Sequence, residues 1–260
     1  PSCSVDGIVT SAAFNQPILT AGTYNVRNLT INAGATVTLL SGAELHICGN
    51  YTNSGSLVAN SGSTVIFDGT GTQNMNGAMT GVDGFANLKI TKSTGSVIMN
   101  APVDVTEDFT TSNSTSIFNV NGQYLSIGGD FMNASGNTTF TNTAGSTLEF
   151  NGSASQIYSP GGSLTLENVI INQPVTSAVV LTGNDMIIGS TGTLQLNSGR
   201  ISTGSYEMSI ANTSTSAVNG GNTNSYVDGN LRRYVNSTGS YNFPVGNYPS
   251  GKGYQLANID

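Results

Sequence analysis

Short bursts of alternating apolar and polar residues, separated by Gly, Asn and Ser, run along most of the chain. Residues 36–39 alternate Thr and Val or Leu and lead into Ser41-Gly42, and residues 43–47 repeat the pattern before Gly49-Asn50. Strands of three to five residues bounded by turn residues have this signature. No stretch keeps a period of 3.6 residues for three turns, so we expect helices to be nearly absent. The pattern predicts an all-β protein.

The sequence also contains an internal repeat that is much longer than this alternation. Three segments return in the same order after about 80 residues: Gly62–Gly69 as Gly145–Gly152, Asn87–Ile90 as Asn168–Ile171, and Gly49–Asn53 as Gly129–Asn133. An internal repeat of about 82 residues then holds about four coils of about 20 residues each, which is the unit of a parallel β-helix. A single coil cannot bury its apolar residues, whereas stacked coils bury them continuously. A β-sandwich also has short strands, but it does not explain the repeat.

The chain divides into three parts on this interpretation. We expect an N-terminal cap at residues 1–22, a β-solenoid at 23–218, and a linker followed by the start of a C-terminal β module, sandwich-like or capping, at 219–260. The chain begins Pro1-Ser2-Cys3, as a mature or trimmed product does. The last residues, 255–260, read as a strand whose free edge is completed by a following segment or by another copy.

The amino-acid composition excludes several classes of protein. Gly, Ser, Thr and Asn supply 128 of 260 residues, only 8% are charged, and the net charge is -7. A helical bundle needs more Ala, Leu, Glu, Lys and Arg. An acidic chain with 7 basic residues does not suit a phosphate backbone, so no nucleic-acid partner is expected. No apolar run approaches the ~18 residues of a membrane-spanning helix.

The two cysteines, Cys3 and Cys48, have three interpretations. In an oxidising compartment they form one disulfide, which would tie the N-terminal segment across the open first coil. They could instead be two unrelated small apolar residues. A metal site with His46, the one histidine, lacks a fourth ligand at any usual spacing. We expect the disulfide, with Cys48 facing outward beside an inward Ile47.

Acidic residues supply the candidate chemistry. Asp104, Glu107 and Asp108 form the one acidic cluster, and Asp130 follows Asp108 by about one coil. Stacked carboxylates could bind a cation together with Glu107, or serve a polysaccharide-cleaving enzyme. No Arg or Lys accompanies them, so we expect solvated turn acids, no catalytic residue and no cofactor. His46 alternates with inward neighbours and should point outward, where a Ser-His-Asp triad would depend on it alone.

Aromatic and threonine residues could form a surface that binds sugars or ice. Tyr24, Tyr51 and Phe85 start strands or turns, as do three later phenylalanines, and stacking inside the coil explains them better than a sugar platform does. A flat wall of Thr permits ice binding, but Thr36-Val37-Thr38 does not repeat regularly.

Several segments resemble known proteins. Gly49–Gly55, Ser63–Gly77, Asn87–Ile90, Val227–Arg233 and Tyr241–Gly246 are similar to segments of large secreted surface proteins of Bacteroidota, exported by the type IX system. The resemblance covers most of residues 23–250. It implies an extracellular, adhesin-like or structural role within a long multidomain chain, and it supplies no catalytic residues.

The expected function is therefore a non-catalytic, extracellular or cell-surface stalk or fibre-forming segment. Its expected partners are other copies or domains of a larger surface protein, and glycans that meet the Thr/Ser/Asn wall. The alternative is a β-helix carbohydrate-active enzyme or glycan-binding module.

Overall fold

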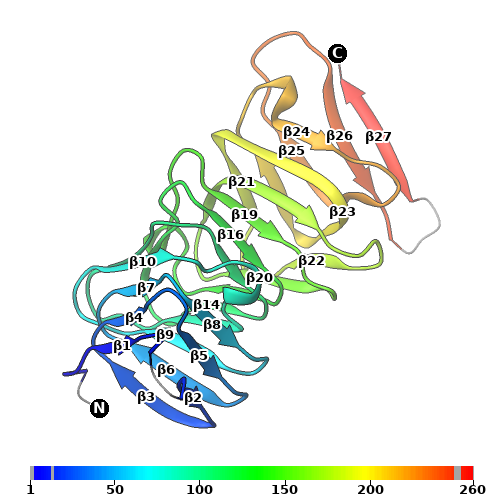
Figure 1. Cartoon of the computed structure of the whole chain (residues 1–260). Coiled ribbons are helices and arrows are strands. Elements are labelled where there is room, and N and C mark those ends of the chain that lie inside the picture. Colours follow the sequence, from blue (N-terminus) through cyan, green and yellow to red (C-terminus); the bar gives the residue numbers. More distant parts are fainter. Residues whose placement is uncertain (1–2, 13–14, 249–252, 260) are drawn as a thin grey trace.

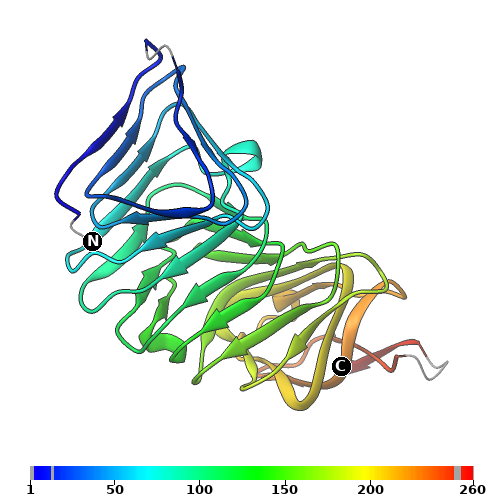
Figure 2. The same cartoon turned by 90° about the horizontal axis from the view of Figure 1, so that it is seen from below.

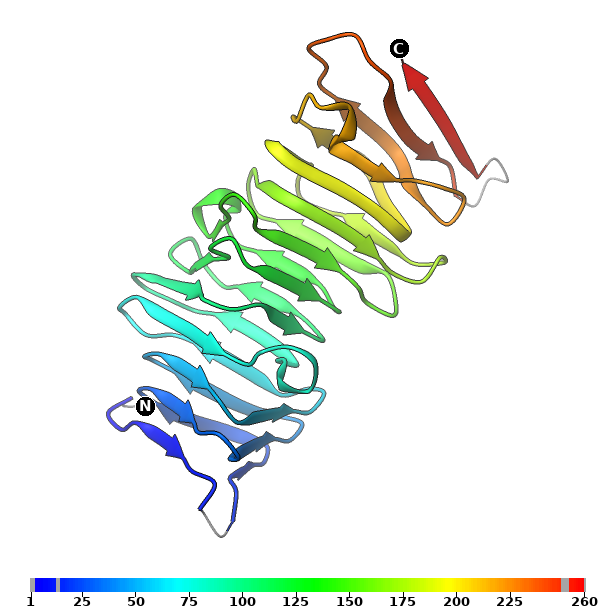
Figure 3. The ribbon, with the colours of Figure 1, turned by 45° about the horizontal axis from the view of Figure 1, so that its top comes forward.

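The computed structural model describes residues 3–12, 15–248 and 253–259, and it is a parallel β-solenoid. About 11 turns of about 22 residues stack along one axis, as Figures 1 and 3 show. Seen from below, the N-terminal coils have a roughly triangular outline (Figure 2). The parallel β-helix predicted from the period-2 bursts and the long repeat is confirmed.

Strands on different sides of the coil form separate sheets. One side holds β1 (Gly7–Val9), β4 (Leu29–Ile31), β7 (Tyr51–Asn53), β10 (Gln73–Gly77), β12 (Ser96–Met99), β15 (Ile117–Asn119) and β18 (Phe140–Thr141). A second, shorter sheet holds β2 (Ile18–Leu19), β5 (Thr36–Leu39) and β8 (Ser56–Ala59).

The remaining strands form one connected sheet along the whole solenoid. They are β3 (Gly22–Val26), β6 (Ala43–Ile47), β9 (Thr64–Phe67), β11 (Asn87–Ile90), β13 (Val103–Val105), β14 (Phe109–Thr111), β16 (Tyr124–Ile127), β17 (Phe131–Asn133), β19 (Thr147–Phe150), β20 (Gln156–Pro160), β21 (Thr165–Asn172), β22 (Ala178–Leu181), β23 (Met186–Ile210), β24 (Val218–Gly220), β25 (Ser225–Arg233), β26 (Tyr241–Gly246) and β27 (Tyr254–Ile259). The helical turns of the described residues are short 3₁₀ segments, η1 (Gly81–Asp83), η2 (Gly136–Thr138) and η3 (Thr215–Ala217).

The strand register shows that the coils differ in length. Leu45 pairs with Val65 of the next coil, and this is one of the shorter separations in sequence between paired residues. The separation is larger between Phe131 and its partner Tyr158, whose coil includes the 3₁₀ segment η2 as well as β18 and β19. The turns therefore vary while the strands stay in parallel register.

Inward side chains fill the coil with apolar residues. Ile31, Leu39 and Ile47 are fully buried, as their period-2 positions predict. Aromatic rings stack from coil to coil: the centroids of Phe109 and Phe131 lie 5.6 Å apart, and those of Phe131 and Tyr158 lie 5.4 Å apart. Such stacking adds to the stabilisation that burial provides.

The long repeat in the sequence corresponds to a repeat in the structure. Asn87–Ile90 pairs in parallel with Thr64–Phe67, and Asn168–Ile171 pairs in the same way with Thr147–Phe150. Gly69 follows the strand Thr64–Phe67, and Gly152 follows the corresponding strand Thr147–Phe150. A Cβ on Gly69 would collide with the carbonyl oxygen of Cys48 one coil away, so the close approach of the two coils requires glycine.

Asparagine side chains connect successive coils at one corner. Asn28 Oδ1 accepts a hydrogen bond from the backbone N of Asn50 at 2.7 Å, and Asn50 Oδ1 accepts one from the backbone N of Asn74 at 2.9 Å. Asn100 and Asn121 continue this ladder through their side-chain amides. Asn121 has φ 54°, the left-handed conformation that asparagine tolerates at turns.

The parallel stacking continues beyond residue 218. Val218 and Gly220 pair with Leu194 and Leu196, and Val227 pairs with Ile201, so the segment 219–224, expected to be a linker, begins within the paired strand β24 and ends where β25 begins. The order changes only at the end, where β27 pairs antiparallel with β26 from Tyr241–Ile259 to Gly246–Tyr254. This hairpin forms the C-terminal end of the stack (Figure 1).

Candidate functional site

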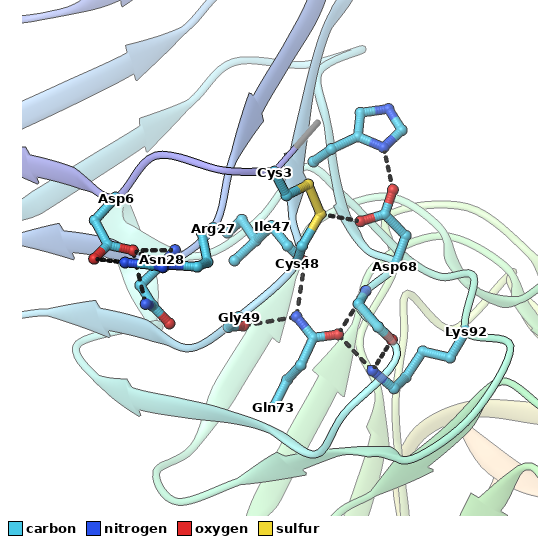
Figure 4. The surroundings of a disulfide bond; sticks show 12 residues. Cys3, Asp6, Arg27, Asn28, Ile47, Cys48, Gly49, Asp68, Gln73 and Lys92 are labelled. Carbon is cyan, nitrogen blue, oxygen red and sulfur yellow. Dashed lines mark hydrogen bonds and ion pairs between the residues drawn. A yellow bond between two sulfur atoms is a disulfide. The ribbon is translucent and has the colours of Figure 1, made fainter. Parts of the chain in front are cut away.

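A disulfide joins the N-terminal segment to the second coil. Cys3 and Cys48 are bonded, with their Cα atoms 5.9 Å apart and a sequence separation of 45 residues (Figure 4). Cys48 leaves the inward row of β6 directly after the fully buried Ile47, which turns its side chain outward. The pairing predicted from the sequence is confirmed.

An ion pair secures the same segment. Arg27 donates hydrogen bonds to both carboxylate oxygens of Asp6, at 2.8 and 2.6 Å, and Asn28 Nδ2 donates to Asp6 Oδ1 at 2.8 Å. The hydrogen bond from Arg27 and that from Asn28 hold the pKa of Asp6 well below its usual range. The N-terminal segment from Cys3 to Asp6, called the strap below, is therefore held to the solenoid by a covalent bond and by an exposed bidentate ion pair.

Asp68 lies between the disulfide and the histidine. Its Oδ2 is 2.6 Å from His46 Nδ1, and its Oδ1 is 3.2 Å from Cys48 Sγ (Figure 4). His46 points outward from β6, as predicted, but its side chain is only 19% exposed because Asp68 of the next coil covers it. Asp68 belongs to the loop after β9, stacked directly over the loop after β6.

Cys3, Cys48 and Asp68 form a compact group of potential metal ligands. One ligand atom from each lies within 4.8 Å of the others, and no second group of three or more such ligands occurs in the described part of the chain. The sequence offered no fourth ligand beside the two cysteines and His46. Asp68 joins the two cysteines because it follows Cys48 by one coil, whereas His46 lies outside the group and contacts Asp68. This relationship becomes visible only once the coil length is known.

A buried polar network lies beside this group. Lys92 Nζ donates to the carbonyl oxygens of Gly69 and Gly71, at 2.6 and 2.8 Å, and to Gln73 Oε1 at 2.6 Å. Its side chain is fully buried, and burial lowers the pKa of Lys92 to about 8, an effect that the nearby charge of Asp68 opposes. Sequence periodicity did not single out this lysine, since an isolated Lys reads as an exposed residue.

The acidic residues singled out in the sequence bind to backbone amides. Asp108 Oδ1 accepts from the backbone N of Asp130 at 2.8 Å, and Asp130 Oδ1 accepts from the backbone N of Ile157 at 2.7 Å. The two aspartates lie one coil apart and are successive members of a ladder between coils. Asp104 bonds to the backbone N of Gly81 and to Ser126 Oγ.

Glu107 points away from this ladder. Its carboxylate accepts hydrogen bonds from Ser61 Oγ, from the backbone N of Gly62 and from Asn87 Nδ2. Burial raises the pKa of Glu107, but these hydrogen bonds outweigh it and hold the pKa below its usual range. Glu107 therefore holds together coils that are well separated in sequence.

The aromatic residues considered as a sugar platform mostly face inward. Tyr51, Phe85, Phe109, Phe131 and Phe140 are each at most 1% exposed, whereas Tyr24 is partly exposed. These five rings belong to the core, as the sequence predicted.

Surface cavities occur at two places among the described residues. An apolar cavity of about 260 Å³ opens at the first coil, between Val9, Leu19, Tyr24 and Val37. A more polar one of about 290 Å³ lies beside Asn137, Thr165 and Glu167. Glu167 Oε1 accepts a hydrogen bond from Thr191 Oγ1 at 2.9 Å, so this carboxylate also connects neighbouring coils.

Comparison with known proteins gives no relative: no family model, no curated protein and no solved structure matches the chain. None of the helices in the described ranges has the length and apolar character needed to cross a membrane. The disulfide favours an oxidising, extracytoplasmic environment.

Proposed function

We propose that this chain is a non-catalytic, extracellular structural or adhesive segment of a bacterial surface protein. The observation that carries the proposal is the continuous stacking of coils, reinforced by side-chain ladders. Backbone strands pair along the whole length, and the Asn28–Asn50–Asn74 ladder adds side-chain hydrogen bonds between those coils. About 11 turns at a strand spacing of about 4.8 Å extend the solenoid over about 50 Å.

Such a stack suits a load-bearing spacer. Each coil contacts its neighbours above and below, so length is gained without flexible joints. The engagement of Asp108, Asp130 and Glu107 in hydrogen bonds between coils supports a mechanical role for these acids. The outward Thr, Ser and Asn side chains offer repeated weak contacts to glycans or to neighbouring chains.

The resemblance of Gly49–Gly55, Ser63–Gly77 and Tyr241–Gly246 to type IX-exported surface proteins of Bacteroidota supports the same proposal. In this reading the partners are other copies or domains of a larger surface protein. The Cys3–Cys48 disulfide supports the extracellular location.

A paired assay separates this function from that of a polysaccharide enzyme. The purified chain is applied to a glycan array, and the same preparation is incubated with polysaccharides while released reducing sugar is measured. Binding without release is the expected result for an adhesive segment. Release that disappears in Asp108→Asn but persists in Asp6→Asn, an exposed acid far from Asp108, would overturn the proposal in favour of a carbohydrate-active enzyme.

A mechanical measurement tests the structural role directly. Pulled from both ends, a stack of coils should lengthen in steps of about 75 Å, since about 22 residues are released at about 3.4 Å each. A single step that releases all coils at low force would argue against a load-bearing spacer.

A further inference from the structure

We propose that, once the Cys3–Cys48 disulfide is reduced, Cys3, Cys48 and Asp68 bind a zinc ion at the N-terminal end of the solenoid. His46 acts as a positioning residue for the carboxylate. The site would therefore be redox-dependent: a disulfide strap in the oxidised protein and a metal-bridged strap in the reduced protein. This inference does not depend on the proposed stalk function.

The distances suit a tetrahedral ion. Zinc lies about 2.3 Å from thiolate sulfur and about 2.0 Å from carboxylate oxygen, so two of its ligands are separated by about 3.5–3.8 Å. Asp68 Oδ1 already lies 3.2 Å from Cys48 Sγ, and all three ligand atoms lie within 4.8 Å of one another. Only the two sulfur atoms must move apart, and with Cα atoms 5.9 Å apart, rotation of the two side chains achieves this.

The donor set selects the metal. Two thiolates with one carboxylate form a mixed soft and hard set that suits Zn²⁺ better than Ca²⁺ or Mg²⁺, which prefer oxygen ligands alone. Three protein ligands leave a fourth position for water. The three side chains are half-buried, so the site is shielded and yet within reach of an ion from solvent.

His46 orients the carboxylate for this purpose. Its Nδ1 contacts Asp68 Oδ2 at 2.6 Å and thereby turns Oδ1 toward the sulfur atoms. Hydrogen bonds of this kind fix the orientation of a metal ligand, and their loss typically lowers metal affinity about 10–100-fold. Lys92, whose ammonium interacts electrostatically with Asp68, offsets part of the negative charge of the ligand set.

The redox step is a simple exchange. A dithiol reductant gives two electrons and two protons to the Cys3–Cys48 bond, which yields two thiols and the oxidised reductant. Zinc binding then releases the two thiol protons, because the thiolate is the ligand.

Cobalt(II) serves as the spectroscopic probe of the full chain. We expect the chain reduced with a phosphine to bind one Co²⁺ with a sulfur-to-cobalt charge-transfer band and tetrahedral ligand-field bands, and Zn²⁺ to displace it. The oxidised chain should show neither band. Absence of the charge-transfer band in the reduced chain, or an equal response of the oxidised chain, would refute the proposal.

Variants separate the ligands from the rest of the fold. Asp68→Asn keeps both cysteines and should weaken Co²⁺ binding at least about 10-fold, and His46→Gln should weaken it about 10–100-fold. Asp130→Asn, an acid of the distant ladder, should bind as the parent does. Equal affinity in Asp68→Asn and the parent would show that the carboxylate is not a ligand.

A stability measurement covers the case in which reduction loosens the strap. Zn²⁺ should raise the melting temperature of the reduced chain and leave that of the oxidised chain unchanged, since a ligand stabilises only the form that binds it. A reduced chain whose melting temperature does not respond to Zn²⁺ would contradict the proposal even if the chain is partly unfolded.

Discussion

Gln156 makes the same hydrogen bonds as Gln73, its counterpart in the earlier of the two long repeats. In each case Oε1 accepts from the backbone N of a preceding glycine, and Nε2 donates to two carbonyl oxygens of the coil below. The partners are Gly69, Ile47 and Gly49 for Gln73, and Gly152, Ile127 and Gly129 for Gln156. The long sequence repeat thus preserves a buried polar anchor as well as an apolar pattern.

The residue above each glutamine differs between the two repeats. Lys92 Nζ donates to Gln73 Oε1, whereas Gln173 Nε2 donates to Gln156 Oε1 at 2.8 Å. A charged amine and a neutral amide therefore occupy corresponding places. The two repeats provide a comparison of a buried lysine with a glutamine inside one molecule.

Gln73→Ala and Gln156→Ala should destabilise the protein to similar extents. Each leaves one glycine N–H and one glycine carbonyl oxygen without their partner, at about 1–3 kcal/mol per group, so a loss of about 2–6 kcal/mol is expected. Urea unfolding followed by circular dichroism measures it. Gln195→Ala serves as the control, because Gln195 is partly exposed and its Nε2 donates to the side chain of Asn197. A loss in the control as large as in the two variants would contradict the anchor role.

Lys92 should make stability depend on pH. Its pKa is lowered from 10.5 to about 8 in the folded protein, so between these values the unfolded chain holds more protons. Stability therefore rises with pH from about 8 to about 10, by about 1–3 kcal/mol. Lys92→Gln, which copies Gln173, should fold and lose this rise. Urea unfolding at about pH 7.5 and about pH 9.5 makes the comparison, and parallel pH profiles of the variant and the parent would contradict it.

The disulfide should protect the N-terminal coils in particular. Loss of the 45-residue loop closure in a Cys3→Ser/Cys48→Ser double variant should cost about 2–4 kcal/mol. In a solenoid this loss is local, so amide exchange should speed up in β1 and β3 and stay unchanged in β19 and β21. Free-thiol labelling of the unreduced parent should modify neither cysteine. Labelling of both cysteines there would show that the bond is absent.

Calcium removal should leave the melting temperature unchanged. A calcium ion takes six to eight oxygen ligands. Here Oδ1 of Asp108 and Oδ1 of Asp130 each accept a hydrogen bond from a backbone amide, and the carboxylate of Glu107 accepts hydrogen bonds from Ser61 and Gly62 at another place. Thermal melts with added Ca²⁺ and with a chelator test this. A melting temperature that rises with added Ca²⁺ in the parent but not in Asp108→Asn would establish a calcium site after all.

Much of the fold could be predicted from local pattern. Alternation at residues 36–39 and 43–47 determines which side chains face inward, because successive side chains of a strand point to opposite sides. The recurrence of Gly62–Gly69 as Gly145–Gly152 determines that coils repeat. Both signals lie within short segments and need no knowledge of what packs against them. The same logic placed Ile47 inward and Cys48 outward, which agrees with the disulfide that two cysteines in an oxidising compartment predict.

The neighbours across coils were decided only by the tertiary structure. His46 lies beside Asp68 of the next coil, but the bond from Asp130 to Ile157 spans a longer stretch of sequence, because the turns between strands differ in length. A shift of one residue would move every stacked side chain to the opposite face. The partners of Asp68, Lys92 and Glu107 therefore follow from the packing of whole coils. Alternation along the chain determines to which side of a strand a side chain points, and the stacking of coils determines which residues of the neighbouring coils it contacts.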